Sequence, residues 1–375
     1  MKSKKRKILY ISGTRADYGL MRETLFKIQK NPKLEIAVVA TGMHIMPEFG
    51  NTINEIKKDG FKIYRIEAKY KKDDKESMAT FVGEMTKLLA KNIKKINPNM
   101  ILLLGDRGEM LAGAVVGAYL NIPIAHIHGG DVSGTVDDVV RNAITKLSDI
   151  HFPATKKSAE RIKKMGVDPR RVFLSGAPGI DGILKEKLFS KKEIFKKYSL
   201  DFRKNFILII QHPVTAEVKD SGKQIKEAMD AVKELGLEAV VIYPNADAGG
   251  RKMIDAIQKY RKYPFIKIYK NIPRKDFLSL MKSASVIVGN SSSGIIESPS
   301  FHIPSVSIGT REEGRERACN VIDVGYKKNE IKEAIEKAIY DKKFAGKIKK
   351  IVSPYGNGEA AKKIVEVLSK INIEK

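Results

Sequence analysis

The fold class is decided by the stretch 100-MILLLGDRGEMLAGAVVGAYLNIPIAHI-127. Its first five residues and its last six, IPIAHI, are short apolar runs of the kind found in buried strands. Residues 107–119, between these two runs, have the apolar spacing of an amphipathic helix. Strand, helix and strand in this order form the βαβ unit of a parallel sheet that is covered by helices on both faces.

The same alternation occurs twice along the chain. The first set also includes the apolar runs 7-KILYIS-12, 35-EIAVVAT-41 and 171-RVFLS-175. The second set consists of 205-NFILIIQH-212, 238-EAVVIYP-244, 264-PFIKIYK-270, 285-SVIVGN-290 and 304-PSVSIG-309.

This repetition predicts an α/β protein with two doubly wound, Rossmann-like domains that face a cleft. We place the first domain at residues 1–178, and expect a C-terminal helix at 357–375 to join it. The second, nucleotide-binding domain is placed at residues 179–356. The joint lies near 175-SGAPGIDGILKEK-187, which is rich in small residues and ends in charge.

The composition indicates a globular protein without a membrane span. Of the 375 residues, 42% are hydrophobic, and no apolar run reaches the ~18 residues that a membrane helix needs. The single cysteine, Cys319, excludes an internal disulfide and a multi-cysteine metal site. Because no signal-peptide pattern is present, we expect a cytoplasmic protein.

The formal net charge of +26 raises the question of nucleic-acid binding. The basic residues are spread over the whole chain, without a basic arm and without a zinc-finger or RNP-like motif. A lysine-rich, solvated surface explains the charge better. We therefore expect neither a nucleic acid nor a membrane as a partner.

Polar segments follow directly after the predicted strands. Ligands of open parallel sheets bind at the carboxyl ends of the strands, so these segments are the candidate site. They include 13-GTRAD-17, 105-GDRGE-109, 128-HGGDVSGTVDD-138, 211-QHPVT-215, 244-PNADAGG-250 and 289-GNSSSG-294.

The serine-rich segment 289–294 leads from a strand into a helix. Ser291, Ser292 and nearby backbone N–H groups can hold a phosphate there, although a serine at this position also caps helices routinely. No Gly-Lys-Ser/Thr follows, and the first strand lacks GxGxxG, which argues against ATP hydrolysis and against a standard dinucleotide site.

Two other residues, Arg15 and His212, are candidates for binding a diphosphate. Arg15 can bind a diphosphate in a fork geometry, or it can form a salt bridge with Asp17. His212 can donate a proton to a leaving phosphate, or it can be structural.

The carboxylates are candidates for acid/base chemistry. Asp106 follows a buried strand, and it is either a proton-transfer group or the N-cap of the next helix. Asp137 and Asp138 are adjacent on a predicted helix, so only one of them can face a cleft. A metal site made by His126, His128 and Asp131 is a weaker alternative, because no HExxH or comparable pattern occurs.

Taken together, these motifs resemble the hydrolysing UDP-N-acetylglucosamine 2-epimerases, in the branch that makes N-acetylmannosamine for sialic-acid-type sugars. The resemblance covers nearly the whole chain, and the order and number of the motifs make it specific. The motifs that carry the resemblance are GTRADYG, FGNT, GDRGE, HGGDVSGTVDDVVRNAITKLSDIHF, LSGAPGID, QHPVT, YPNADAGG, GNSSSGIIE, GTREEGRE and YGNG.

The resemblance implies the two-domain GT-B fold, no cofactor and no metal, and a homodimer or homotetramer that binds a UDP-sugar. It implies acid/base roles for Asp106 and Asp137, and a contact between His212 and the leaving phosphate. It also implies that a second group of residues holds the substrate: Arg15, Arg107, Asn245, Ile272, Ser291, Ser292, Glu297 and Arg311.

One position departs from the family pattern. Several relatives have Glu where this chain has His128, and that Glu is among the proposed acid/base residues. Asp131 or His128 itself is expected to take over its role, while Gly129 and Gly130 are expected to let the backbone approach the ligand.

The predicted reaction converts UDP-N-acetylglucosamine to N-acetylmannosamine and UDP, by anti elimination to a glucal and subsequent hydration. Three alternatives remain besides a nucleic-acid binder: a hydrolysing 2-epimerase of a UDP- or GDP-linked diacetamido sugar, a GT-B glycosyltransferase and a non-catalytic sugar-nucleotide sensor.

Overall fold

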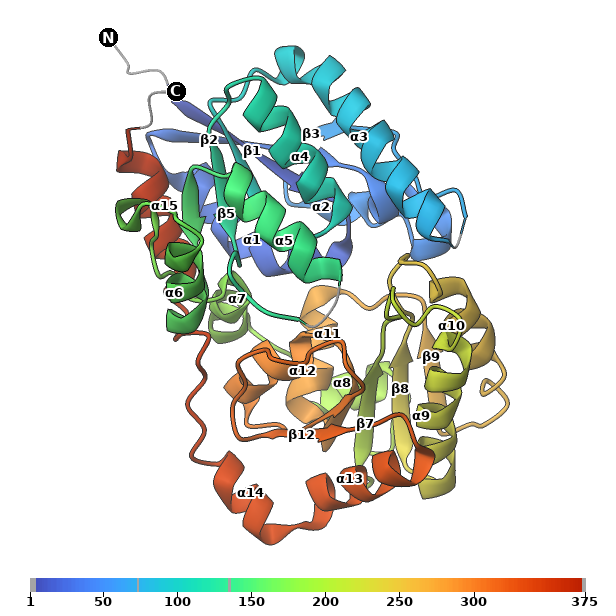
Figure 1. The fold of residues 1–375 in the computed structure, drawn as a ribbon. Coiled ribbons are helices and arrows are strands. Elements are labelled where there is room, and N and C mark those ends of the chain that lie inside the picture. The colour runs from blue at the N-terminus through green and yellow to red at the C-terminus, as the bar shows by residue number, and fades with distance from the viewer. Residues whose placement is uncertain (1–4, 73, 134–135, 373–375) are drawn as a thin grey trace. The chain divides into compact units, whose positions relative to one another are not determined.

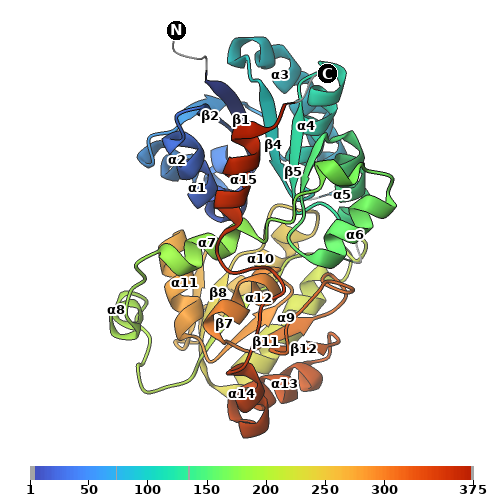
Figure 2. The same ribbon diagram turned by 90° about the vertical axis from the view of Figure 1, so that its left-hand side faces the viewer.

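The computed structural model describes residues 5–72, 74–133 and 136–372. In this part of the chain, twelve strands form two separate parallel sheets of six strands each. The first compact unit contains the chain up to Asp131, the segment Val136–Leu184 and the chain from Tyr355 onward. The second unit consists mainly of Lys185–Pro354. Figures 1 and 2 show both units from two directions.

The first sheet has the strand order β3-β2-β1-β4-β5-β6, the order of a Rossmann sheet. Its strands are β1 Arg6–Ser12, β2 Leu34–Ala40, β3 Lys62–Arg65, β4 Met100–Leu104, β5 Ile124–Ile127 and β6 Ile150–Phe152. The helices of this unit are α1 Arg15–Lys30, α2 Ile53–Lys58, α3 Lys75–Ile96, α4 Gly108–Tyr119, α5 Val136–Leu147, α6 Lys156–Lys164, α7 Pro178–Lys185 and α15 Ala360–Lys370, with short 3-10 turns η1 Gly42–Ile45, η2 Pro47–Phe49 and η3 Pro169–Arg171.

Helices cover both faces of this sheet, as its two-sided apolar strands require. Helices α1 and α15 lie side by side and share a core with alternate residues of β1, β2 and β4. Helices α3, α4 and α5 lie next to one another, as Figure 1 shows. The buried carboxylate of Asp181 accepts the backbone N–H groups of Ala360 and Ala361 at 3.0 and 2.8 Å, and so anchors the start of α15.

The second sheet has the order β12-β11-β10-β7-β8-β9, which is the Rossmann order again when its strands are counted from β7. Its strands are β7 Phe206–Ile210, β8 Glu238–Ile242, β9 Ile266–Tyr269, β10 Val286–Gly289, β11 Ser305–Ile308 and β12 Val321–Val324. The helices of this unit are α8 Lys191–Lys197, α9 Ser221–Leu235, α10 Gly250–Gln258, α11 Arg274–Ser283, α12 Ser293–Ile296, α13 Lys328–Tyr340 and α14 Lys342–Ile348, with the 3-10 turn η4 Ser298–Phe301.

The predicted fold class, two Rossmann-like α/β halves, is confirmed, whereas some individual elements were predicted wrongly. The apolar run 171–175 is not a strand: only Val172 bridges to His151, and the sixth strand is the three-residue segment Ile150–Phe152. The edge strands β3 and β12 were not predicted, because half-exposed edges lack a continuous apolar run. No helix within the described residues is both long and apolar enough to cross a membrane.

Strand order reverses beside β1 and β4 in the first sheet, and beside β7 and β10 in the second. At such switch points the carboxyl ends of the strands leave a crevice for a ligand. Gly289, which ends β10, has φ of +131°, and a Cβ there would lie 2.0 Å from the carbonyl oxygen of Ile210. The close approach of β10 to β7 at this crevice therefore requires glycine.

We predict that Gly289→Ala destabilises the second unit by about 2–4 kcal/mol, since the new methyl group clashes with backbone and the residue stays at positive φ. Thermal unfolding should show a midpoint lower by about 5–15 °C. Gly346→Ala is the matched control: Gly346 lies inside α14, and a Cβ there would meet no atom within 4 Å, so the midpoint should stay equal or rise. Equal midpoints for both variants would contradict this account.

Candidate active site

The loop after β1 is shaped by the buried carboxylate of Asp17. Asp17 accepts the backbone N–H groups of Gly13 and Thr14 at 3.0 and 2.7 Å, and also a short hydrogen bond from the hydroxyl of Ser12. With Thr14 it forms the capping box of α1. Burial raises the pKa of Asp17, while these donors oppose the rise. Asp17 thus orders the turn that carries Arg15, the first residue of α1.

Glu109 fills the space between the ends of β1 and β4. Its side chain is fully buried, and a Cβ on Gly13 would lie 2.1 Å from its Oε1, so glycine is needed there. Tyr70 donates to Oε1 at 3.2 Å, and Arg107 donates from Nε to Oε2 at 3.2 Å. Arg107, predicted as a nucleotide contact, is thereby tied to a buried carboxylate of its own unit.

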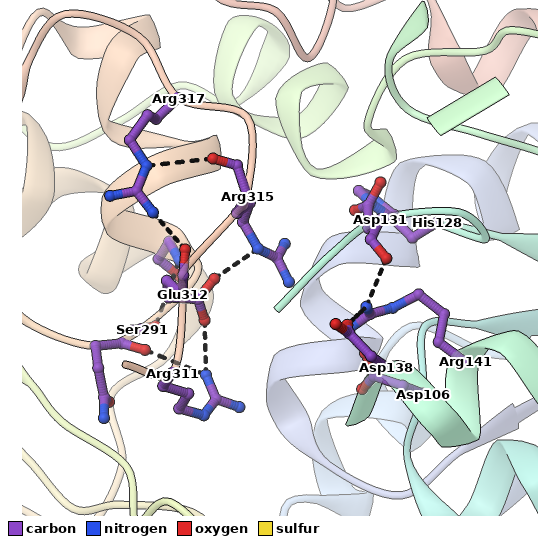
Figure 3. A network of polar contacts seen from close by, with 12 residues as sticks. Asp106, His128, Asp131, Asp138, Arg141, Ser291, Arg311, Glu312, Arg315 and Arg317 are labelled. Atoms are coloured by element: carbon purple, nitrogen blue, oxygen red, sulfur yellow. Dashed lines mark hydrogen bonds and ion pairs between the residues drawn. The ribbon is translucent and has the colours of Figure 1, made fainter. Parts of the chain in front are cut away.

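Arg141 organises the carboxylates at the end of β4 and the start of α5 (Figure 3). Its guanidinium is almost completely buried and forms a short ion pair with Asp106. It also donates to Asp138 at 2.6 Å and to the backbone carbonyl of Asp131 at 2.8 Å. The helix α4 has Arg107 at its N-cap, so the alternative in which Asp106 is the N-cap is wrong. Asp106 is instead a charge held by Arg141.

Of the two adjacent acids in α5, Asp138 is the one that pairs with Arg141. Asp137 precedes it and is half-buried. Since neighbouring residues of a helix point about 100° apart, Asp137 has a different direction from the residue held by Arg141. The assignment of Asp137 as a catalytic acid stays a prediction.

The loop after β5 carries a pair formed by His128 and Asp131. His128 Nδ1 lies 2.9 Å from Asp131 Oδ2, and both side chains are largely buried. Ser158 donates to the other carboxylate oxygen of Asp131 at 2.7 Å. Gly130 has φ of +75°, and a Cβ there would meet the Ser158 carbonyl oxygen at 2.3 Å. Gly130 therefore lets the loop pack on α6, a role different from the predicted ligand approach.

Two further histidines of this unit are buried and neutral. His126 has Nε2 at 2.8 Å from the Gly105 carbonyl and Nδ1 at 3.2 Å from the Thr145 hydroxyl, so both ring nitrogens are already occupied. Burial lowers the pKa of His126 to about 3. His44 lies between Ser12 and Thr52, and burial lowers its pKa to about 4. Both histidines hold loops together at the strand ends.

At the second switch point, the backbone of His212 is clamped by the buried side chain of Asn290. The Asn290 amide accepts from the His212 N–H at 2.6 Å and donates to its carbonyl at 2.8 Å. The backbone N–H of Asn245 donates to His212 Nδ1 at 3.1 Å. Because Nδ1 is an acceptor, the ring proton of the neutral imidazole lies on Nε2, which is then a donor. The side chain of Asn245 donates to Asp247 at 2.5 Å.

Glu312 contacts three arginines, of which Arg311 lies near Ser291 of the serine loop (Figure 3). Its buried carboxylate lies 2.9 Å from Arg311 Nη1 and 2.6 Å from Arg315 Nε. Arg317 donates to its backbone carbonyl. Arg311 also donates to the Asn290 carbonyl at 3.2 Å, beside Ser291. Glu312 thus fixes the guanidinium of Arg311 beside the serine loop, where a cation suits an anionic group.

The serine loop itself is short. Ser292 is the N-cap of α12, which has a single turn, and Ser291 accepts from the Ser293 N–H at 3.4 Å. Glu297, at the end of that turn, is fully buried and forms a short ion pair with Arg274. The second oxygen of Glu297, Oε2, has no hydrogen-bond partner in the described part of the chain. Ile272 is completely buried in the core beside β7 and β8, so its side chain contributes to packing.

A protein-family model described as UDP-N-acetylglucosamine 2-epimerase matches residues 26–369 of the chain. The chain belongs to this epimerase family. It is 39% identical, over 98% of its length and 96% of the relative's, to a UDP-N,N'-diacetylbacillosamine 2-epimerase (hydrolyzing) of Legionella pneumophila. It is 34% identical, over 89% of its length and 87% of the relative's, to a UDP-N-acetylglucosamine 2-epimerase of Neisseria meningitidis.

The fold is also that of solved enzymes of the epimerase family. A crystal structure of UDP-GlcNAc 2-epimerase from Neisseria meningitidis, bound to UDP-GlcNAc, matches with a TM-score of 0.82 at 21% identity, over 97% of this chain and 100% of that one. The Methanocaldococcus jannaschii enzyme matches with a TM-score of 0.80 at 19% identity, over 97% and 99%. The predicted GT-B-like fold and the predicted family are thus confirmed.

Sequence reasoning missed several residues of the candidate site in this epimerase. Arg274 was not singled out, and neither were Arg141, Asn290 and Glu312, although these three lie within quoted motifs. The one sequence feature that could have pointed to them is that a polar residue lies close in sequence to a candidate carboxylate, histidine or arginine. Their importance depends on burial, which a single sequence does not give for charged residues, since these are usually exposed.

We predict that Arg141→Met destabilises the protein by about 2–4 kcal/mol, because it leaves the carboxylates of Asp106 and Asp138 without their shared cation. The triple variant Arg141→Met, Asp106→Asn, Asp138→Asn should recover part of the loss, since the two negative charges that Arg141 balanced are removed as well. The measurement is chemical denaturation. Arg170→Met is the control, because that exposed pair with Asp168 should contribute little. A triple variant less stable than Arg141→Met would contradict the charge-balance argument.

We also predict that stability falls as the pH is lowered from about 6.5 toward 4. Burial lowers the pKa of His126 to about 3, and the pKa values of His44 and His151 to about 4, from an ordinary value of 6.5. In this window the unfolded chain binds protons that the folded one does not, which costs up to ~1.4 kcal/mol per pH unit for each histidine. His151→Phe should reduce the pH slope of the unfolding free energy by about that amount. An unchanged slope would show that His151 titrates normally in the folded protein.

Proposed function

We propose that the protein is a hydrolysing 2-epimerase of a UDP-linked 2-acetamido sugar, and that it releases UDP and the free C2 epimer. One observation carries the proposal: Asp106 lies at the carboxyl end of a central strand, at a switch point, as a charge held by the buried Arg141. A carboxylate fixed there is suited to moving a proton on a bound sugar. The relatives named as hydrolysing epimerases support the reaction type.

In the proposed reaction, a base removes the C2 proton of the sugar while the bond between C1 and the diphosphate oxygen breaks. The electron pair of the C2–H bond forms the double bond of a 2-acetamidoglucal, and UDP leaves with the electrons of the C1–O bond. Water then adds at C1, and a proton enters at C2 from the opposite face. In this scheme Asp106 and Asp137 form the acid/base pair of the first unit.

The second unit supplies groups for the nucleotide in this proposal. His212 Nε2 is set as a donor by the Asn245 N–H, which suits the departing phosphate, where negative charge develops. Arg311 and the serine loop residues Ser291 and Ser292 offer a cation and hydroxyls for the diphosphate. The orphan Oε2 of Glu297 is an acceptor suited to a ribose hydroxyl. Arg15 and Arg107 of the first unit are proposed as further ligand arginines.

Two substrates are candidates. UDP-N-acetylglucosamine follows from the motifs and from the Neisseria meningitidis relative at 34% identity. UDP-N,N'-diacetylbacillosamine is favoured by the Legionella pneumophila relative at 39% identity, and the Campylobacter jejuni relative at 36% identity is named for the GDP- or UDP-linked form of the same sugar. His128, in place of the Glu expected from the motif, also separates this chain from the plain N-acetylglucosamine pattern. We therefore propose the diacetamido sugar as the better substrate.

We predict that the protein incubated with either UDP-sugar releases UDP and free 2-epimerised sugar in equal amounts, with kcat/KM at least about tenfold higher for the diacetamido substrate. Separation of nucleotides and sugars by liquid chromatography checks both products. Asp106→Asn should lower the rate by about 10²–10⁴-fold, because the proton-transfer group is lost. A product that keeps UDP attached to the sugar would overturn the hydrolysing assignment. Sugar transfer to an acceptor would favour a glycosyltransferase.

A further inference from the structure

His128 has a backbone conformation that is unusual for its residue type. Its φ is +63°, in the left-handed region that costs a non-glycine residue on the order of 1 kcal/mol. It stands at the end of β5, where its N–H donates to the Phe152 carbonyl at 3.1 Å. Other non-glycine residues with positive φ in the described chain include Asn97 and His302, which lie at helix C-termini, where this conformation is common. His128 is at a strand end that carries candidate catalytic residues.

The surrounding contacts fix the direction of the His128 ring. Asp131 Oδ2 lies 2.9 Å from Nδ1, and Asp131 Oδ1 accepts from the Ser158 hydroxyl at 2.7 Å. Thr155, the N-cap of α6, donates to Ser158 at 2.9 Å. The chain of contacts therefore runs from the start of a helix through a hydroxyl and a carboxylate to an imidazole. Each member is held by the one before it.

The loop that carries this chain is itself held by cations. Arg141 donates to the Asp131 carbonyl at 2.8 Å, and Arg161 donates to the Gly130 carbonyl at 2.9 Å. In these contacts both arginines bind backbone oxygens and not the Asp131 carboxylate. The two oxygens of that carboxylate face His128 and Ser158. Side-chain exposure is 4% for Asp131 and 11% for His128, which leaves the ring as the accessible end of the chain.

A carboxylate at Nδ1 determines the tautomer of the ring. Nδ1 must carry the proton to donate to Asp131, so the neutral ring has its lone pair on Nε2. Nε2 has no hydrogen-bond partner among the described residues, whereas both nitrogens of His126 are occupied. When Nε2 accepts a proton, Asp131 stabilises the imidazolium that forms. This is the arrangement of a general base with an orienting carboxylate.

We propose that His128 is the base of the elimination step, and that Asp131 is its positioning residue. The inference rests on the proposed function. Nε2 takes the proton from C2 as the C2–H electrons form the C1=C2 bond and the C1–O electrons leave with UDP. The imidazolium then passes its proton to solvent. Asp106 and Asp137 serve the other proton transfers, and the histidine takes over the role that several relatives give to a Glu.

The test compares His128→Gln, Asp131→Asn and the double variant with wild type, using UDP-sugar turnover and hydration of added 2-acetamidoglucal in the presence of UDP. We expect each single variant to lower kcat for UDP release by about 10²–10⁴-fold with KM changed less than about threefold. The double variant should be no slower than His128→Gln within about threefold, because Asp131 acts through the histidine. His128→Gln should still hydrate the glucal.

Thermal unfolding and the exposed control Asp168→Asn show whether a loss of rate is merely structural. Long-range ¹H–¹⁵N NMR spectra supply a readout that does not depend on turnover: the wild-type His128 proton should lie on Nδ1, and in Asp131→Asn it should move to Nε2.

Three results would overturn the proposal. The first is a His128→Gln variant that keeps more than about a third of the wild-type rate, and the second is a double variant that is slower than both single variants by a further factor of about ten. The third is a His128→Gln variant that forms the glucal and fails to hydrate it. Each of these, with an active wild type, contradicts the dyad and leaves the proposed function standing. A wild type that releases no UDP from either sugar contradicts both.

Discussion

The buried guanidinium of Arg141 is the interaction on which the first half of the candidate site depends. It balances Asp106 and Asp138 and ties down the backbone of Asp131, so three segments that are separate in sequence share one cation. Carboxylates crowded at a strand end repel one another and are costly to bury unless they are paired. Arg141 supplies the pairing cation and holds both carboxylates in fixed positions. The position of Asp106 is therefore set by Arg141, and Asp106 is not the N-cap of α4.

In the second half of the candidate site, buried side chains likewise fix the candidate ligand-binding residues, here through one neutral amide and one charge. Asn290 is buried and satisfies both backbone groups of His212, and the Asn245 N–H sets the tautomer of the ring. Glu312 is the counterpart of Arg141, a single buried charge that fixes two charges of opposite sign. In both units, the residues expected to meet a ligand are therefore held by partners that face the interior. Such support gives a reactive group a fixed direction.

The sequence was sufficient to predict the architecture, because parallel strands buried on both faces read as apolar runs and the helices between them have a clear period. The sequence was misleading where the apolar pattern of a segment does not match its secondary structure. The run 171–175 is apolar enough for a strand but contributes one bridge, whereas the strand β6 was missed because it has only three residues and the polar His151 is its middle one. The order of the motifs located the candidate site at the strand ends. The partners of its residues could not be predicted, since pairing across 35 positions, as between Asp106 and Arg141, depends on the tertiary fold.

Glycine and histidine show the same limit at single residues. Gly130 was expected to give a ligand room, but it is needed because α6 packs against it. His126 and His128 are two positions apart on one segment, yet both ring nitrogens of His126 are occupied, whereas the ring of His128 contacts the described residues through Nδ1 only, at the Asp131 carboxylate. Spacing alone could not separate these roles, since alternate residues of a strand share a face.

The central claim is that the protein inverts C2 of a UDP-linked acetamido sugar and releases the sugar from UDP. Incubation with the UDP-sugar in heavy water, followed by proton NMR, tests this claim most directly. The account predicts free UDP and a released C2 epimer in which the C2 proton is replaced by deuterium, because that proton is exchanged with solvent during elimination and hydration. A released sugar that keeps its C2 proton and its original configuration would contradict it.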